Sequence, residues 1–319
     1  MCIALCRAAP NLKPDWKSPA KSRKIKTRDI PQFILFTHDD NTDKRSSYYV
    51  TDVTKNFKNP NGCHINAAFY TTKAYSDCKT VKDLYNKGHE IGGHTMTHRK
   101  TSSLSSKEKK KEIAGVRKWL IEECGIPAKD VRGQRNPYLL GDPEMRKFMV
   151  EAGYDYDTSL PEHYNSKSSP SASKRLWPYN MKYGMVQMDS CNYFGQKLNQ
   201  CSKSERPDLV QIPMWMYQKS PSRPSSKNLM DPPNAYNVLM AELKRNYKAH
   251  RAPVGIWTHS TSTRYLDQQK NRDQVKKFLK AALKIDGVWV VTPSQLLDWM
   301  ENPVPKQKMA EFMSKYTCS

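Results

Sequence analysis

The sequence lacks long hydrophobic runs, closely paired cysteines and N-glycosylation sequons. Its longest apolar runs, such as residues 288–291, are far too short to cross a bilayer, so we expect no membrane span. None of the eight cysteines forms a Cys-x-x-Cys pair, which argues against zinc ribbons and thioredoxin-type redox sites. No internal repeat or second hydrophobic block is visible. These absences favour one globular domain.

Acidic residues are scarce relative to basic ones. The chain has 53 Lys and Arg against 31 Asp and Glu, a formal net charge of +22. Such a charge favours approach to polyanions, and acidic matrix polymers are therefore candidate partners. The basic residues are spread along the chain and no nucleic-acid-binding motif accompanies them, so nucleic acid is the least favoured partner. A solvated basic surface is the favoured explanation of the charge.

The cysteines are even in number and widely spaced. This pattern predicts disulfides formed in an oxidising compartment, and hence an extracellular, secreted protein whose signal peptide is not in this chain. Cys191 and Cys201 are the first pair we expect to be bridged. Cys2 or Cys6 paired with Cys318 would tie the termini together, and the remaining pairings stay open.

Short apolar segments alternate with helical patterns from residue 32 onward. Eight segments have the character of strands: 33–36, 67–70, 90–92, 131–133, 154–156, 209–212, 254–257 and 288–291. Helical patterns cover residues 105–124, 143–152, 234–249, 272–285 and 294–300. The alternation implies parallel strands, and the predicted fold is α/β: a single distorted (β/α) barrel of seven or eight strands.

The remaining segments set the predicted domain limits. Residues 1–30 are rich in Pro and Lys and predict an extended basic arm, residues 31–303 form the barrel domain, and residues 304–319 form a C-terminal tail that a disulfide could tether. In residues 161–209 the alternation of apolar strands and helical patterns stops, which predicts a long loop inserted in the barrel. Four aromatic residues in or near this loop either line a groove or pack in the core: Trp177, Tyr179, Trp215 and Tyr217.

Ionisable residues follow five of the predicted strands. In chain order they are Asp39 with Asp40, His94 with His98, Arg135 with Tyr138, Asp157, and His259. In a parallel barrel all these strand ends lie on one face, where active sites form. Each residue alone has an ordinary explanation as a cap, turn, ion-pair or core residue, but the five together favour a site. The spacing of four predicts that His94 and His98 share one helical turn and one cation.

At these residues the chain resembles the NodB-homology polysaccharide deacetylases, carbohydrate esterase family 4, and among them the arthropod-type chitin deacetylases. The matching motifs are Thr-x-Asp-Asp at Thr37, His-Thr-x-x-His at His94, Arg-x-Pro-Tyr at Arg135, Tyr-Asp-Thr-Ser at Tyr156, and His259 at a strand end. The resemblance spans roughly residues 28–303. It implies a monomeric, metal-dependent hydrolase that removes acetyl groups from N-acetylglucosamine units of chitin or chito-oligosaccharides and releases acetate.

The resemblance also implies a role for each motif residue. A divalent metal, Zn²⁺ with Co²⁺ as the alternative, would be held by Asp40, His94 and His98. Asp39 would be the general base, steadied by Arg135, while His259 would protonate the departing amine with its pKa raised by Asp157. The backbone N–H of Tyr138 would face the oxyanion.

The chain departs from the family pattern at three places. His38 replaces the usual Phe before the aspartate pair, Trp257 replaces Leu two residues before His259, and no aromatic closely follows Asp157. These differences affect the expected pocket shape and rate more than the reaction type. Two alternatives stay open: a catalytically weak chitin-binding matrix protein, and a deacetylase of peptidoglycan or xylan.

Overall fold

Strands and helices alternate in the computed structural model, which describes residues 9–12, 25–162, 175–185, 201–202, 204–217, 229–260 and 265–318. The strands are β1 (Gln32–Asn41), β2 (Ala68–Thr72), β3 (Glu90–Gly93), β4 (Gly133–Gln134), β5 (Tyr156–Asp157), β6 (Pro161–Glu162), β7 (Tyr179–Asn180), β8 (Val210–Gln211), β9 (Met214–Trp215), β10 (Val254–Thr258) and β11 (Val288–Val290). The helices are α1 (Lys44–Thr54), α2 (Cys78–Asn86), α3 (Ser106–Glu122), α4 (Pro143–Ala152), α5 (Ala235–Lys248), α6 (Gln269–Ala282), α7 (Pro293–Glu301) and α8 (Met309–Met313).

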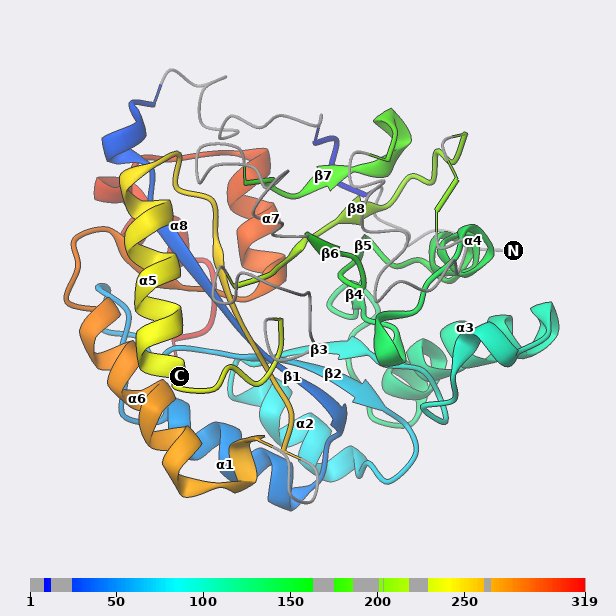
Figure 1. Cartoon of the computed structure of the whole chain (residues 1–319). Helices are drawn as coiled ribbons and strands as arrows, with labels where there is room; N and C mark the ends of the chain where they lie inside the picture. The colour runs from blue at the N-terminus through cyan, green and yellow to red at the C-terminus, as the bar shows by residue number, and fades with distance from the viewer. Residues whose placement is uncertain are drawn as a thin grey trace.

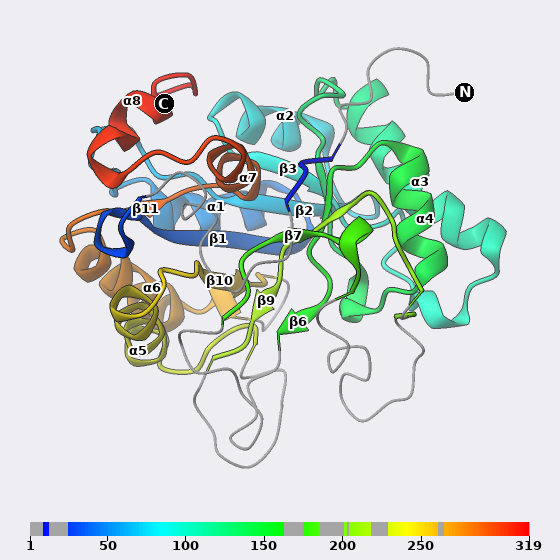
Figure 2. The same cartoon turned by 90° about the horizontal axis from the view of Figure 1, so that it is seen from above.

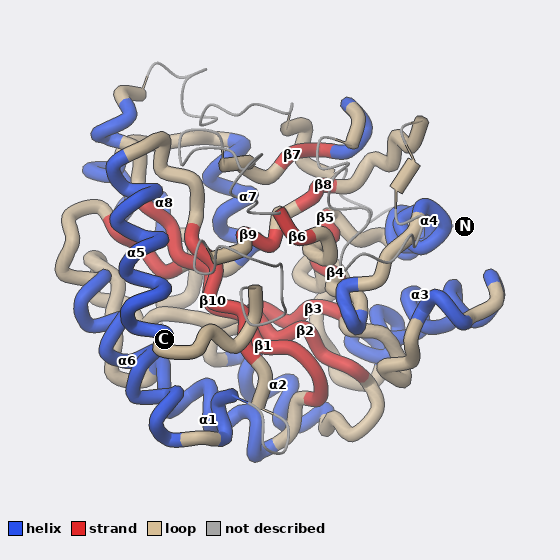
Figure 3. Tube along the Cα trace, viewed as in Figure 1, coloured by secondary structure: helices blue, strands red, loops and turns tan. Residues whose placement is uncertain are grey.

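One curled sheet organises the described residues. Its strand order is β10-β1-β2-β3-β4-β5-β8-β7, and β11 also pairs with β1. Every pairing in this sheet is parallel except that of β7 with β8. Helices surround the strands in two perpendicular views (Figures 1 and 2) and in the tube drawing of Figure 3. The predicted distorted (β/α) barrel is therefore confirmed, as an open, curled sheet.

The predicted elements correspond closely to the observed ones. Each of the eight predicted strands overlaps an observed strand, and the five predicted helices correspond to α3, α4, α5, α6 and α7. Helices α1, α2 and α8 and strands β6, β7 and β9 were not predicted. The short strands lie in or beside the segment expected to be a decorated loop. In isolation, two-residue strands have no periodicity to detect.

Local sequence signals fix several helix ends. Ser105 and Glu108 form a reciprocal capping box at the start of α3. Asp142 caps α4, Pro143 occupies its first turn, and Gly153 ends it in the left-handed conformation with φ 87°. These signals explain why the predicted bounds of α3 and α4 lie close to the observed ones.

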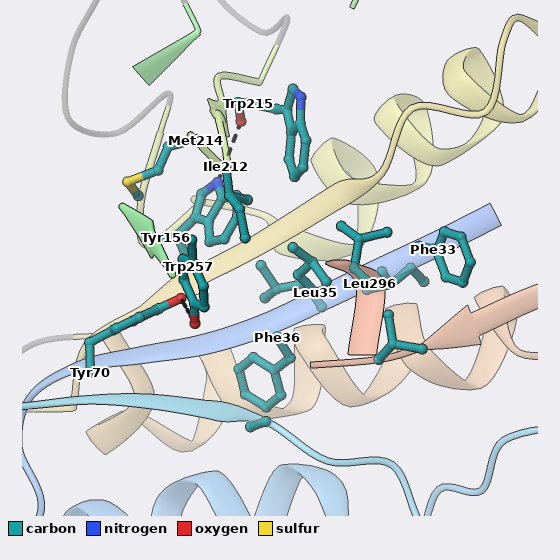
Figure 4. Close-up of a cluster of buried hydrophobic side chains, with 14 of the residues drawn as sticks. Phe33, Leu35, Phe36, Tyr70, Tyr156, Ile212, Met214, Trp215, Trp257 and Leu296 are labelled. Atoms are coloured by element: carbon teal, nitrogen blue, oxygen red, sulfur yellow. Dashed lines mark hydrogen bonds between the residues drawn. The ribbon is translucent and has the colours of Figure 1, made fainter. Parts of the chain in front are cut away.

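The core lies on both faces of the sheet. Phe33, Leu35 and Phe36 of β1 are fully buried, and Figure 4 shows them in one cluster with Trp257 of β10 and Leu296 of α7. The rings of Trp257 in β10 and Trp215 in β9 stack with their centroids 6.0 Å apart (Figure 4). The Tyr217 hydroxyl donates to Gly255 O over 3.1 Å, which joins the segment after β9 to β10.

The four loop aromatics lie in the core. Each is at most 3% exposed: Trp177, Tyr179, Trp215 and Tyr217. Their rings therefore pack in the core and do not line a surface groove. Burial of large aromatic rings contributes much of the core's stability.

Two disulfides lie wholly within the described residues, and both join distant parts of the chain. Cys63 bonds Cys318, and Cys78 bonds Cys124. The predicted bridge from Cys2 or Cys6 to Cys318 is therefore wrong, because the C-terminal cysteine reaches the turn after α1 and not the N-terminal arm. The predicted partner of Cys201, Cys191, lies outside the described residues.

The two chain ends contact the barrel domain where they are described. In the N-terminal segment Leu12 is buried, and its carbonyl accepts a hydrogen bond of 2.7 Å from the Asn180 N–H. In the C-terminal segment, α8 buries Met309 and Met313 before the Cys318 bridge. Over the residues that the structure describes, no helix is long and apolar enough to cross a membrane.

Candidate metal centre and active site

Asp40, His94 and His98 meet at the carboxyl ends of β1 and β3. One potential ligand atom from each lies within 4.8 Å of the others. The Asp40 Oδ1 atom is 3.0 Å from His98 Nε2 and 3.7 Å from His94 Nε2. The His94 Nδ1 atom lies 2.8 Å from the carbonyl oxygen of Arg135, so that this nitrogen donates to the backbone and Nε2 faces Asp40.

The donor set fits a divalent metal ion. A carboxylate oxygen and two imidazole nitrogens are the usual ligands of zinc, and three protein ligands are typical of its catalytic sites. The hydrogen bond from His94 to the backbone holds the tautomer that such a ligand requires. Burial alone would raise the pKa of Asp40, but hydrogen bonds from His94 and His98 bring it well below its usual range. Asp40 therefore carries a negative charge at neutral pH.

The segment from His94 to His98 is a bent loop and not a helical turn. Thr95 and His98 have positive φ values of 68° and 58°, and no residue of the segment is helical. The expectation of a shared helical turn was therefore wrong, although the two rings are adjacent, with centroids 5.2 Å apart. The His98 N–H donates to Thr95 Oγ1 over 3.2 Å, which closes the bend.

Backbone strain is concentrated at this site. Asp40, Thr95, His98 and Tyr138 all have positive φ, a conformation that residues with a Cβ adopt rarely. Each costs on the order of 1–3 kcal/mol and persists only where surrounding contacts fix it. Such clusters are typical of ligand-binding sites.

Asp39 forms a buried ion pair with Arg135. The Arg135 Nη1 atom donates to Asp39 Oδ1 at 2.5 Å, and the two side chains are 0% and 2% exposed. The same nitrogen donates to Thr37 Oγ1 over 2.8 Å. The guanidinium lies 4.2 Å from the Tyr70 ring centroid and 5.0 Å from the Trp257 ring, so aromatic faces on two sides fix its plane.

The Tyr70 ring is itself anchored within the barrel. Its hydroxyl lies 3.0 Å from that of Tyr156, and Figure 4 shows the two phenols turned toward each other. The Tyr156 hydroxyl donates to Glu90 Oε1 over 2.6 Å. A continuous network thus connects the ion pair to the base of β3.

His259 pairs with Asp231, which the sequence interpretation missed. The His259 Nδ1 atom is 2.7 Å from Asp231 Oδ2, and the His259 N–H donates to Asp231 Oδ1 over 2.9 Å. Burial lowers the pKa of His259, but the charge and hydrogen bond of Asp231, with smaller effects of Asp40 and Asp39, raise it to about 9. His259 is therefore protonated at neutral pH.

Asp157 does not have the predicted contact with His259. It accepts a hydrogen bond of 2.5 Å from Ser159 Oγ, and Arg146 is the largest charge acting on it. The register of β4 and β5 pairs Asp157 with Gln134, so the side chains of these two residues point to the same face of the sheet. The Asp157 side chain therefore points to the face of the sheet opposite Arg135. The prediction that Asp157 raises the pKa of His259 is corrected in favour of Asp231.

The missed Asp231 had one weak signal. It is followed by two prolines before a helical pattern, so it reads as a turn residue, and its φ of 52° agrees with a turn. Nothing in the spacing of 28 residues indicates that its carboxylate reaches His259.

Tyr138 lies beside His98 on a one-turn 3-10 helix, Pro137–Leu139. Its ring centroid is 5.1 Å from that of His98, and its side chain is 58% exposed. Its φ of 57° turns the backbone sharply after Pro137. Within the described part of the chain, no group accepts a hydrogen bond from the Tyr138 N–H.

His38, where the family usually has Phe, is a fully buried residue of β1. Its Nε2 atom is 2.5 Å from Ser260 Oγ, and its ring lies 5.5 Å from that of Phe69. Burial lowers its pKa to about 4, although Asp40 and Asp39 act in the opposite direction. His38 is thus neutral at pH 7 and adds no charge near the Asp39–Arg135 pair.

Comparison with known proteins agrees with this geometry. Residues 26–156 match the family model described as polysaccharide deacetylase. The chain is 28% identical over 300 residues to chitin deacetylase 1 of Bombyx mori, covering 88% of this chain and 52% of that protein. It is 24% identical over 307 residues to chitin deacetylase 8 of the same organism, covering 92% of this chain and 76% of that protein. The chain thus spans about half the length of the first of these relatives.

A solved structure shows the same fold. A Mycobacterium smegmatis protein described as a polysaccharide deacetylase superimposes with a TM-score of 0.58 at 16% identity, covering 93% of this chain and 95% of that one. The matched segment of the family model contains Asp39, Asp40, His94, His98 and Arg135. Residues 26–156 thus match a polysaccharide deacetylase domain, and most of the chain is similar in sequence to two chitin deacetylases.

Proposed function

We propose that this protein is a metal-dependent hydrolase that removes N-acetyl groups from chitin or chito-oligosaccharides and releases acetate. The observation that carries the proposal is the meeting of three groups at one end of the sheet: the metal-type cluster Asp40, His94 and His98, the Asp39–Arg135 pair, and the protonated His259. The similarity to two chitin deacetylases favours chitin as the substrate.

A divalent ion, Zn²⁺ or Co²⁺, when held by Asp40, His94 and His98, would act as a Lewis acid on the acetyl carbonyl and lower the pKa of water. Asp39 would take the proton from the attacking water as general base. The ion pair with Arg135 holds the carboxylate in one orientation, since the guanidinium is itself fixed by Thr37, Tyr70 and Trp257.

The other half of the reaction needs an acid and an oxyanion donor. His259 would protonate the departing amine, because its pairing with Asp231 keeps it charged at neutral pH. The Tyr138 N–H would donate to the oxyanion of the tetrahedral intermediate, and its positive φ supports this by turning the donor away from the regular backbone direction. Asp39 would thus assist the attack of water, and His259 would assist the departure of the amine.

Acetate release tests the proposal. We expect the protein to release acetate from N-acetylglucosamine oligomers, and we expect a chelator to abolish release and added Zn²⁺ or Co²⁺ to restore it. Acetylated xylan and peptidoglycan, tested in parallel, distinguish the chitin assignment from the other polysaccharides. Chitin binding without acetate release, in protein shown to hold the metal, would instead identify a matrix protein and refute the enzyme assignment.

Replacing Asp231 by Asn should shift the alkaline limit of activity. Burial would then lower the pKa of His259 without an opposing carboxylate, so the decline of kcat/KM, expected near pH 9 in the parent, should move down by more than about one pH unit. The measurement is kcat/KM for acetate release between pH 6 and pH 10. Asp157→Asn is the matched control, and an equal shift in that variant would contradict the assignment of Asp231.

The same pair makes folding stability depend on pH. Since the pKa of His259 is raised on folding, its contribution to stability is fully present below about pH 6.5 and is lost as the pH rises through about 9. The Asp231→Asn variant should lack this loss when thermal unfolding is measured across that range.

We also propose that the protein is extracellular. The bridges Cys63–Cys318 and Cys78–Cys124 support an oxidising compartment. Acidic matrix polymers stay a predicted partner, motivated by the net charge of +22.

A further inference from the structure

The loop that carries both candidate histidine ligands is held by helix α3. We call residues 94–98 the ligand loop. Helix α3 lies alongside the carboxyl end of β3, from which the loop emerges (Figure 1). The three residues between the histidines are not part of the candidate ligand cluster, yet each is fixed by a contact outside the site.

Glu112 of α3 accepts two hydrogen bonds from Thr97 of the ligand loop. Its Oε2 atom accepts a hydrogen bond of 2.9 Å from the Thr97 N–H, and its Oε1 atom accepts one of 2.6 Å from the Thr97 hydroxyl. The Glu112 residue is 5% exposed. A buried carboxylate needs such partners, and charge-assisted bonds of this kind are stronger and geometrically more specific than neutral ones.

Gly115, one turn further along α3, gives Met96 its position. A Cβ at residue 115 would lie 3.0 Å from Met96 Cγ and 3.1 Å from Met96 Sδ, closer than such atoms normally pack. Residues three apart lie on the same helix face, so Glu112 and Gly115 present one surface to the loop. The absence of a side chain at Gly115 lets the loop approach α3 closely enough for the Glu112 bonds to form.

The opposite side of the loop is held by the segment after β2. The Lys73 N–H donates to Thr95 O over 3.2 Å, and the Ala74 N–H donates to Met96 O over 2.9 Å. Between these two supports, Thr95 and His98 hold positive φ values that residues with a Cβ adopt rarely. A loop released on the α3 side would keep that conformation at His98 only through the His98 N–H bond to Thr95 Oγ1 and the contact of His98 with Asp40.

We propose that Glu112 and Gly115 are positioning residues that pre-organise His98 for the metal. Their contribution is to hold the ligand loop in its strained shape before the ion arrives, so they set metal affinity. The inference rests on the metal site of the proposed function but not on the substrate or the reaction.

Metal affinity, measured without substrate, tests this inference. In full-length protein, competition with a chromophoric chelator should show that Glu112→Ala weakens Zn²⁺ binding by about 10–100-fold, the range observed when groups that orient metal ligands are removed. Glu112→Gln retains an acceptor for the Thr97 N–H and should recover most of the affinity. Glu122→Ala, on the same helix but exposed and 3.7 Å from Lys118 Nζ, is the control and should bind like the parent.

Gly115→Ala supplies an independent variant should Glu112→Ala fail to fold. The added methyl group should push Met96 outward and weaken Zn²⁺ binding, and a second change, Met96→Ala, should restore it by removing the contact. A purely structural role would lower the melting temperature of the metal-free protein and leave the affinity of the folded fraction unchanged.

The outcomes separate this inference from the proposed function. If Glu112→Ala and Gly115→Ala each changed the Zn²⁺ affinity by less than about twofold, the change would be well below the predicted loss. That result would overturn the positioning role even if acetate is released. Weakened binding in these variants, with no acetate release by the metal-loaded parent, would support the positioning role and refute the proposed function. A parent protein that binds no Zn²⁺ overturns both.

Discussion

Replacing Asp39 by Asn should lower kcat for acetate release by about 10²–10⁴-fold, the range typical for loss of a general base. The amide has the shape of the carboxylate but cannot accept a proton from water. Metal content should stay at the parent level, because the cluster of Asp40, His94 and His98 does not include Asp39. Acetate release and metal content, measured on the same preparation, check both statements.

Loss of stability must be separated from loss of chemistry in that variant. Arg135 is fully buried, and removing its charged partner should destabilise the fold by about 3–5 kcal/mol, as in other broken buried ion pairs. Asp155→Asn is a matched control, since it breaks the buried pair between Asp155 and Arg132, whose atoms lie 2.6 Å apart. We expect this control to unfold at lower temperature but to keep its kcat. A similar kcat in Asp39→Asn and the parent would contradict the role of Asp39.

Replacing His94 by Ala should abolish metal-dependent activity. His94 is only 2% exposed and its Nε2 atom faces Asp40, so the replacement removes one of the three candidate ligand groups from the cluster. Removing a ligand should weaken binding more than removing a group that only orients one, which implies a loss of more than about 100-fold in affinity. Metal content by elemental analysis and acetate release with excess Zn²⁺ are the measurements.

The histidine at position 64 provides the control for His94→Ala. His64 lies on the turn beside the Cys63 bridge, before the amino end of β2 and not at the carboxyl ends of β1 and β3, and its replacement by Ala should leave metal binding and kcat unchanged. If His94→Ala kept one tightly bound ion per chain, or if chelators did not affect the parent, the cluster of Asp40, His94 and His98 would not be the catalytic centre.

The candidate site could be predicted to the extent that it depends on strand ends. Asp39 and Asp40 lie in the last three residues of β1, while His94 and Arg135 directly follow β3 and β4, and the parallel arrangement brings those ends together whatever the details of the loops. The ion pair between Asp39 and Arg135 and the approach of His94 to Asp40 follow from this arrangement. These are the parts of the site that strand register decides.

Other parts of the site depend on contacts that spacing does not encode. The interval of four residues suggested a helical turn for His94 and His98, but the segment is a strained bend that contacts Glu112 and Gly115 of the following helix α3. Likewise the carboxylate that charges His259 is Asp231, 28 residues away along the chain. Asp157, which stood in the expected motif, faces the other side of the sheet because side chains alternate along a strand.

By itself the amino-acid sequence determined the alternation of strands and helices, the face on which polar residues gather, and the identity of the metal-type ligands, because hydrophobic periodicity and residue chemistry are local properties. Only the tertiary structure decided that the sheet stays open, that Cys318 meets Cys63, and that Asp231 and not Asp157 partners His259. Several groups of the same chemistry could have formed each of these contacts. Which of them lie within a few ångströms of one another depends on how the whole core packs.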